Sequence, residues 1–89
     1  MNSAEKIHIG ELVQSVKGHD KGEYFLVVSA DSEFVYICNG KSRKASKLKR
    51  KKQKHVIKTG EVCEWIKDYP EKVNNTSVRK AIRGLRKNK

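Results

Sequence analysis

Residues 11–30 read ELVQSVKGHDKGEYFLVVSA, which is two runs rich in branched and aromatic side chains on either side of a polar segment with two glycines. Such runs are typical of β-strands, and a glycine can adopt the positive φ that a tight connection between strands requires. We therefore expect residues 11–16 and 24–30 to form a β-hairpin around the loop 17–22.

Three more short strands are expected after this hairpin. Residues 34–38 have strand composition, and the Asn39-Gly40 pair that follows them strongly predicts a two-residue hairpin turn. That turn predicts a short, polar fourth strand at residues 42–45, and residues 55–57 are expected to add a fifth. Short strands at this spacing indicate a small five-stranded β-barrel.

The last third of the chain has the period of a helix. Two sets of apolar residues recur at the i, i+3, i+4, i+7 spacing of one helical face. They are Val62, Trp65, Ile66 and Tyr69, and then Val78, Ala81, Ile82 and Leu85. Thr59 is the expected N-cap of the first helix, and Pro70 is its expected end. Opposite the apolar face of the second helix, an arc of about 120° holds only bases. These bases are Arg79, Lys80, Arg83, Arg86 and Lys87.

Length and composition limit the class of protein. With 89 residues, we expect one small domain, with the barrel at residues 1–59 and a helical extension at residues 60–89. Hydrophobic residues make up 36% and charged residues 35%, which predicts a thin core and excludes a large cofactor-binding enzyme. No nucleophile elbow or phosphate-binding glycine loop is present, so we expect neither catalysis nor a cofactor. Cys38 and Cys63 lack CxxC partners and are predicted to be free thiols, with no metal site.

Charge is distributed unevenly along the chain. Its 21 Lys and Arg residues against 10 Asp and Glu residues give a net charge of +11. Residues 34–60 carry ten bases and no acid, and residues 77–89 carry six bases and no acid, whereas the other segments are net acidic. Two separate basic blocks favour a polyanionic partner, and nucleic acid is the first to consider. Neither a signal peptide nor a run of about 20 apolar residues is present, so we expect a cytoplasmic protein that does not engage a membrane.

Residues 10–28 resemble a KOW motif, in which a strand, a Lys/Gly loop closed by a glycine and a hydrophobic strand follow one another. Residues 10–59 are similar to the barrel of the large-subunit ribosomal protein fourteen type of archaea and eukaryotes. They look closer still to short bacterial KOW-domain RNA-binding proteins, which end in a helix similar to residues 78–82. The resemblance implies a mainly β fold, namely a small SH3-like five-stranded barrel with a C-terminal α-helical extension. It also implies that the ligand is RNA, with rRNA and the ribosome as the expected setting.

The resemblance places Gly22 at the characteristic glycine of the motif and the loop 17–22 against RNA. Asp20 and Glu23 depart from the pattern, because they make this hairpin less basic than a typical rRNA-contacting one. That departure shifts the expected main contact to the segment 41–54, which we expect to be a basic loop.

Three groups of residues are the candidate RNA-binding residues. The KOW-like loop supplies Lys17, His19 and Lys21. The basic segment supplies Lys41, Arg43, Lys44, Lys47, Lys49, Arg50, Lys51, Lys52 and Lys54. The C-terminal helix supplies Arg79, Lys80 and Arg83.

Other interpretations stay open at the level of sequence. We expect the protein to be a monomer. An alternative to RNA binding is that its barrel docks on ribosomal proteins or on RNA polymerase, as KOW domains of transcription-elongation factors do. A DNA-coating protein is a further alternative. Binding of the basic helix to an anionic membrane ranks last, because its apolar face lacks Trp and Phe. The plainest interpretation of residues 47–54 is a solvated loop that binds nothing. For the aromatic residues on the strands, the plainest interpretation is that they belong to the core.

Overall fold

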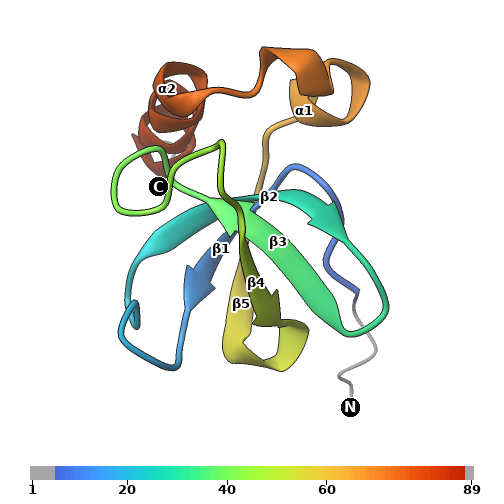
Figure 1. The fold of residues 1–89 in the computed structure, drawn as a ribbon, viewed down its shortest axis with the longest axis vertical. Coiled ribbons are helices and arrows are strands. Elements are labelled where there is room, and N and C mark those ends of the chain that lie inside the picture. The colour runs from blue at the N-terminus through green and yellow to red at the C-terminus, as the bar shows by residue number, and fades with distance from the viewer. Residues whose placement is uncertain (1–5, 88–89) are drawn as a thin grey trace.

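A computed structural model describes residues 6–87 of the chain, which form a strongly curved β-sheet with helices packed on one side (Figure 1). The strands are β1 (Glu11–Ser15), β2 (Tyr24–Ala30), β3 (Phe34–Cys38), β4 (Lys49–Lys52) and β5 (Val56–Val62). The helical elements are the 3-10 turns η1 (Gln53–His55) and η2 (Pro70–Lys72) and the α-helices α1 (Trp65–Asp68) and α2 (Asn75–Lys87).

The sheet is antiparallel, with strand order β4-β3-β2-β1-β5. Its two edge strands follow one another in the chain, because η1 leads directly from β4 into β5. The sheet must therefore curve until its edges approach. Within residues 6–87, no strand pairing joins β4 to β5, so the barrel-like sheet is open. The expected mainly β fold, with five strands and a C-terminal helix, is confirmed.

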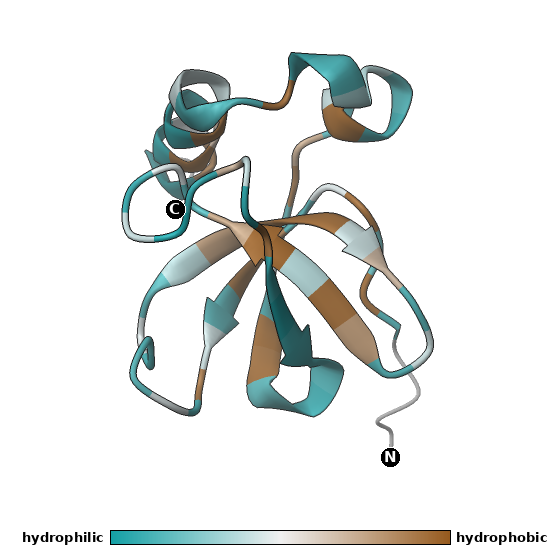
Figure 2. Ribbon diagram, in the orientation of Figure 1, coloured by the Kyte–Doolittle hydropathy of each residue, from teal (hydrophilic) through white to brown (hydrophobic). Residues whose placement is uncertain are grey.

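The central strands bury side chains on both faces, which explains their almost continuous apolar sequence (Figure 2). One cluster fills the inside of the curve and contains Ile7, Val13, Phe25, Val27, Val35, Ile37 and Val56. A second cluster lies between the opposite face and the helices and contains Leu12, Leu26, Cys38, Cys63, Ile66, Val78 and Ile82. The helical extension is thus half of a second core rather than a loose tail.

The fourth strand does not lie where the sequence predicts it. Residues 39–48 form a connection, and β4 begins only at Lys49, where it pairs with Ile37 of β3. The side-chain oxygen of Asn39 accepts hydrogen bonds from the backbone N–H groups of Lys41 (2.9 Å) and Arg43 (3.0 Å). Asn39 therefore organises a wide loop instead of a two-residue turn, and the expected basic loop 41–54 is partly a strand.

The boundary between the sheet and the helices was also predicted wrongly. Strand β5 extends to Val62, so Thr59 lies inside a strand and is not an N-cap. Glu64 is the N-cap residue of α1, and this helix covers only Trp65–Asp68. Val62 matches the helical period by coincidence, because a short apolar run fits both a strand and a helix.

Helix α2 begins at Asn75, directly after a reciprocal pair of capping hydrogen bonds. The side-chain oxygen of Asn74 accepts from the N–H of Ser77 (2.8 Å), and the N–H of Asn74 donates to Oγ of Ser77 (3.0 Å). As the period predicts, Val78 and Ile82 are buried against the sheet. Among the helices of residues 6–87, none has the length and apolar character needed to cross a bilayer.

Candidate nucleic-acid interface

Asp20 lies within the KOW-like loop, residues 17–22, and fastens that loop to β4. Its carboxylate accepts a hydrogen bond from Oγ of Ser15 (2.6 Å) and forms ion pairs with Nζ of Lys51 (2.7 Å) and of Lys49 (2.8 Å). Lys51 also donates to the carbonyl oxygen of Lys17 (2.6 Å). Burial raises the pKa of the Asp20 carboxyl, but the hydrogen bonds from the two lysines and the serine outweigh burial and hold it well below its usual range.

The strand conformation of β4 divides the bases of this segment between two faces. Lys49 and Lys51 point toward Asp20, and Lys51 is only 8% exposed. Arg50 and Lys52, on the alternate positions, are exposed, and the guanidinium carbon of Arg50 lies 4.7 Å from the centroid of the Phe34 ring. Lys51 is therefore part of an internal ion pair, and its ammonium is not available to an external phosphate.

Glu23, the second acid of the hairpin, also accepts hydrogen bonds from other protein groups. Its Oε1 accepts hydrogen bonds from the side-chain N–H of Asn39 (3.2 Å) and from Oγ of Ser42 (3.0 Å). The same loop exposes Lys17, His19 and Lys21 to solvent. Asp20 and Glu23 thus hold neighbouring segments together, and Lys17, His19 and Lys21 remain as the exposed basic side chains of the loop.

The connection 39–48 is docked on the first turn of α2. Gly40 has a φ of +77°, and a Cβ at this position would lie 2.5 Å from the carbonyl oxygen of Asn75. Nη1 of Arg79 donates to the carbonyl oxygen of Gly40 (2.8 Å), and the N–H of Ala45 donates to the side-chain oxygen of Asn75 (2.8 Å). Only glycine fits this backbone and this close approach. The contact brings the internal and the C-terminal basic blocks together.

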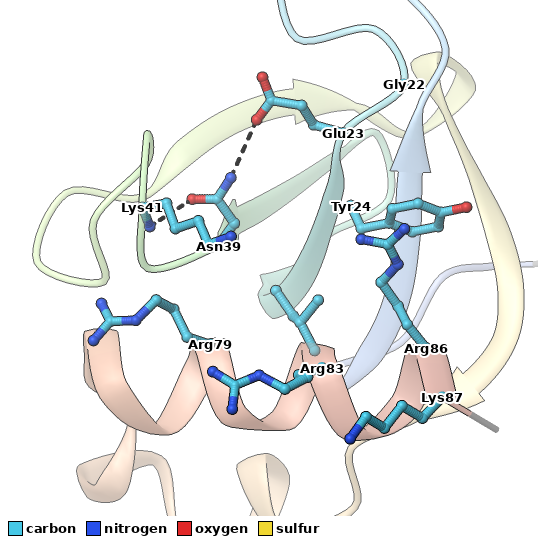
Figure 3. A pocket seen from close by; sticks show the side chains of 10 residues that line it. Gly22, Glu23, Tyr24, Asn39, Lys41, Arg79, Arg83, Arg86 and Lys87 are labelled. Atoms are coloured by element: carbon cyan, nitrogen blue, oxygen red, sulfur yellow. Dashed lines mark hydrogen bonds between the residues drawn. The ribbon is translucent and has the colours of Figure 1, made fainter.

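A groove of about 590 Å³ lies between α2, this connection and the start of β2 (Figure 3). Five basic side chains line it, which are Lys41, Arg79, Arg83, Arg86 and Lys87. Glu23 is the one acid among the described residues that line it, and its carboxylate is bonded to Asn39 and Ser42. Tyr24 and Ile82 add apolar surface to the wall.

A smaller hollow of about 200 Å³ adjoins the groove, because Glu23 lines both. It is lined by three of the predicted site residues, His19, Arg43 and Lys49, together with the acid Asp20. The KOW-like loop, the connection 39–48 and α2 therefore meet on one face of the molecule. This face is the candidate functional site.

The structure separates the fifteen predicted site residues into groups. Lys41, Arg79 and Arg83 line the groove, and His19, Arg43 and Lys49 line the hollow beside it. Those that line neither are Lys17, Lys21, Lys44, Lys47, Arg50, Lys51, Lys52, Lys54 and Lys80.

The sequence-based site omits seven of the ten residues that line the groove, and Tyr24, Arg86 and Lys87 are among them. Arg86 and Lys87 could have been included, because they belong to the same helical arc as Arg79 and Arg83. Nothing in the sequence places Tyr24 there, since an aromatic residue on a strand is more often in the core.

Both cysteines are free, as predicted, and the structure also buries both of them. Burial raises the pKa of the Cys38 thiol to about 11. In the part of the chain that the structure describes, no three His, Cys, Asp or Glu side chains are close enough together to hold a metal ion. No protein-family model matches the chain, and no curated protein matches it either. The basic groove is therefore the feature from which a function can be argued.

Proposed function

We propose that this chain is a non-catalytic, KOW-type RNA-binding protein that acts as a monomer in the cytoplasm, on rRNA at or near the ribosome. In this proposal RNA phosphates lie along the basic groove. The observation that carries the proposal is the convergence of five basic side chains from two distant segments on one groove of about 590 Å³.

The arrangement of the bases on α2 suits an extended polyanion. Arg79, Arg83 and Lys87 follow one another at four-residue steps, so the line of cations extends over about 12 Å of helix axis. A single small anion needs no such length, whereas successive phosphates of one strand do. Guanidinium groups also bind phosphate oxygens through paired N–H donors.

Electrostatics on this face favour an anion for a second reason. The acids nearest to the groove and the hollow, Glu23 and Asp20, already accept hydrogen bonds from protein groups. Lys49 and Lys51 compensate the charge of Asp20 before any ligand arrives, and five bases outnumber the single charge of Glu23 in the groove. RNA is the favoured polyanion because the chain resembles KOW proteins, and because A-form RNA is recognised mainly through its backbone and 2′-hydroxyl groups.

The test is fluorescence anisotropy with a labelled RNA duplex over a series of KCl concentrations. The double variant Lys41→Gln/Arg83→Gln should bind more weakly, and the slope of log Kobs against log salt should fall by roughly 0.7 to 0.9 for each lost phosphate contact. These two residues are chosen because both are exposed and neither side chain fastens the loop to α2, as Arg79 does.

The matched control is Lys67→Gln/Lys72→Gln, which removes the same charge from exposed positions that line neither the groove nor the hollow. Its salt slope should equal that of the wild type. Equal slopes for all three proteins would refute the groove as the contact surface, and absence of binding by the wild type would refute RNA binding. Duplex DNA of the same length, used as a competitor, should displace the RNA less effectively than unlabelled RNA does.

A further inference from the structure

The wall of the groove contains an aromatic residue that phosphate binding does not explain. Tyr24 begins β2, and its ring is partly buried at the border of the second core. The guanidinium carbon of Arg86 lies 4.3 Å from the centroid of this ring, so the cation covers one face of the tyrosine (Figure 3). The pair therefore combines two flat groups, one of them positively charged, at the edge of the groove.

The same pair also borders a second hollow, of about 430 Å³, on the outer face of β1 and β5. Leu12, Gln14 and Ile57 are among its other lining residues, and Ile57 is 50% exposed. Lys58 is the one base besides Arg86 among the described residues that line this hollow, so Tyr24 and Arg86 stand between a groove lined by five bases and a hollow lined by two. A ligand that reaches them can place an anionic part on one side and an uncharged part on the other.

A nucleotide has this division between a charged and a flat, uncharged part. The groove volume lies within the range of about 300 to 1,000 Å³ that is typical of small-molecule sites. Bases released from a helix stack on aromatic rings or on guanidinium planes. A base inside an intact duplex is already stacked between its neighbours and cannot reach the pair.

We propose that Tyr24 and Arg86 form a stacking site for one unpaired base of an RNA, while Arg83 and Lys87 hold the phosphates that flank it. This inference rests on the RNA binding proposed above and makes it more specific. The preferred RNA is then a helix interrupted by a bulged or looped-out nucleotide, and not a continuous duplex.

The test compares three labelled RNA hairpins that share one stem: a fully paired stem, a stem with one bulged adenosine, and the same bulge with an abasic residue. The bulged and abasic RNAs carry equal numbers of phosphates, so the ratio of their affinities isolates the contribution of the base. We expect the bulged RNA to bind about 5- to 150-fold more tightly than the abasic RNA, the factor that stacking of one base provides.

Variants of Tyr24 and Arg86 test whether these two residues cause the difference in affinity between the bulged and the abasic RNA. Tyr24→Phe retains a ring and should retain the ratio, whereas Tyr24→Leu should bring it close to one. Arg86→Lys retains the charge but loses the guanidinium plane, and it should also lower the ratio. Because Arg86 is exposed, this variant tests the site even if Tyr24→Leu does not fold. Arg83→Gln should weaken binding to both RNAs by the same factor.

The possible failures are distinguishable. If the wild type binds all three RNAs equally, with a steep salt dependence, the stacking site is refuted and RNA binding stands. If it binds none of them, both proposals fall. Adenosine monophosphate should compete only weakly, and competition as strong as that of the bulged RNA would overturn the assignment to an RNA strand.

Discussion

Asp20 is the residue that holds the loop 17–22 beside β4 and next to the hollow of the candidate site. Its carboxylate is buried among Ser15, Lys49 and Lys51, and it ties the KOW-like loop to an otherwise exposed, positively charged edge strand. Without this acid, two lysines would face each other and the loop backbone without compensation. The carboxylate of Asp20 therefore allows Lys49 and Lys51 to lie on the same side of β4.

This role predicts a specific dependence of stability on pH. The folded-state pKa of Asp20 lies below the ordinary value of 3.8, so its contribution to stability is complete above about pH 4 to 5 and is lost as the pH falls toward the folded-state value. At pH 7, Asp20→Asn should lower the free energy of unfolding by about 3 kcal/mol, because it leaves the buried ammonium of Lys51 and the partly exposed ammonium of Lys49 without their partner. Urea denaturation at pH 7 and pH 3 should show the difference between wild type and variant shrinking in acid.

The matched control is Asp68→Asn, at an exposed position, which should change stability little at either pH. A second variant, Asp20→Asn/Lys51→Met, should recover part of the loss, because replacing both members of a buried pair avoids an unpaired charge. If Asp20→Asn cost the same free energy at pH 3 as at pH 7, the ion pairs could not be its cause.

At the level of elements, some of the fold could be predicted from the sequence and some could not. The β1–β2 hairpin and β3 could be predicted because two cores bury both faces of these strands, which gives them unmistakably apolar sequences. Strand β4 could not, because its four residues are all basic and hydrophilic (Figure 2). It is a strand only through its pairing with β3 and its attachment to Asp20.

The candidate site, too, could be predicted from the sequence only in part. The basic arc of α2 could be predicted, because a helix repeats every 3.6 residues and its basic positions fall on one side. The groove itself could not, since it exists only where the connection 39–48 lies against the first turn of that helix. Periodicity describes one element at a time, whereas a groove is a property of the packing of two.

The contact between this connection and α2 predicts opposite effects for two similar substitutions. Gly40→Ala should destabilise the protein by about 1 to 3 kcal/mol, because residue 40 has a φ of +77° and the new Cβ would meet the backbone of Asn75. Gly84→Ala should stabilise it by about 1 kcal/mol, because Gly84 lies inside α2 with no atom within 4 Å of the new methyl group. Urea denaturation of both variants measures these changes in the free energy of unfolding. If both changes had the same sign, the described contact between the connection 39–48 and α2 would be contradicted.

At the level of the whole molecule, the net charge of +11 and the groove should act on different steps of binding. The long-range field of all bases raises the association rate of a polyanion, whereas side chains in direct contact determine how fast the complex dissociates. Two variants with the same loss of charge separate these effects: Lys41→Gln/Arg83→Gln in the groove, and Lys52→Gln/Lys54→Gln at exposed positions that do not line it.

Stopped-flow measurements with labelled RNA at low salt should show similar decreases in the association rate for both double variants, because each removes two positive charges from the same field. Only the groove variant should also dissociate faster, since it alone loses contacts that the bound RNA makes. Faster dissociation of Lys52→Gln/Lys54→Gln would instead place RNA against β4 and η1, and the contact surface would then extend over the edge of the sheet.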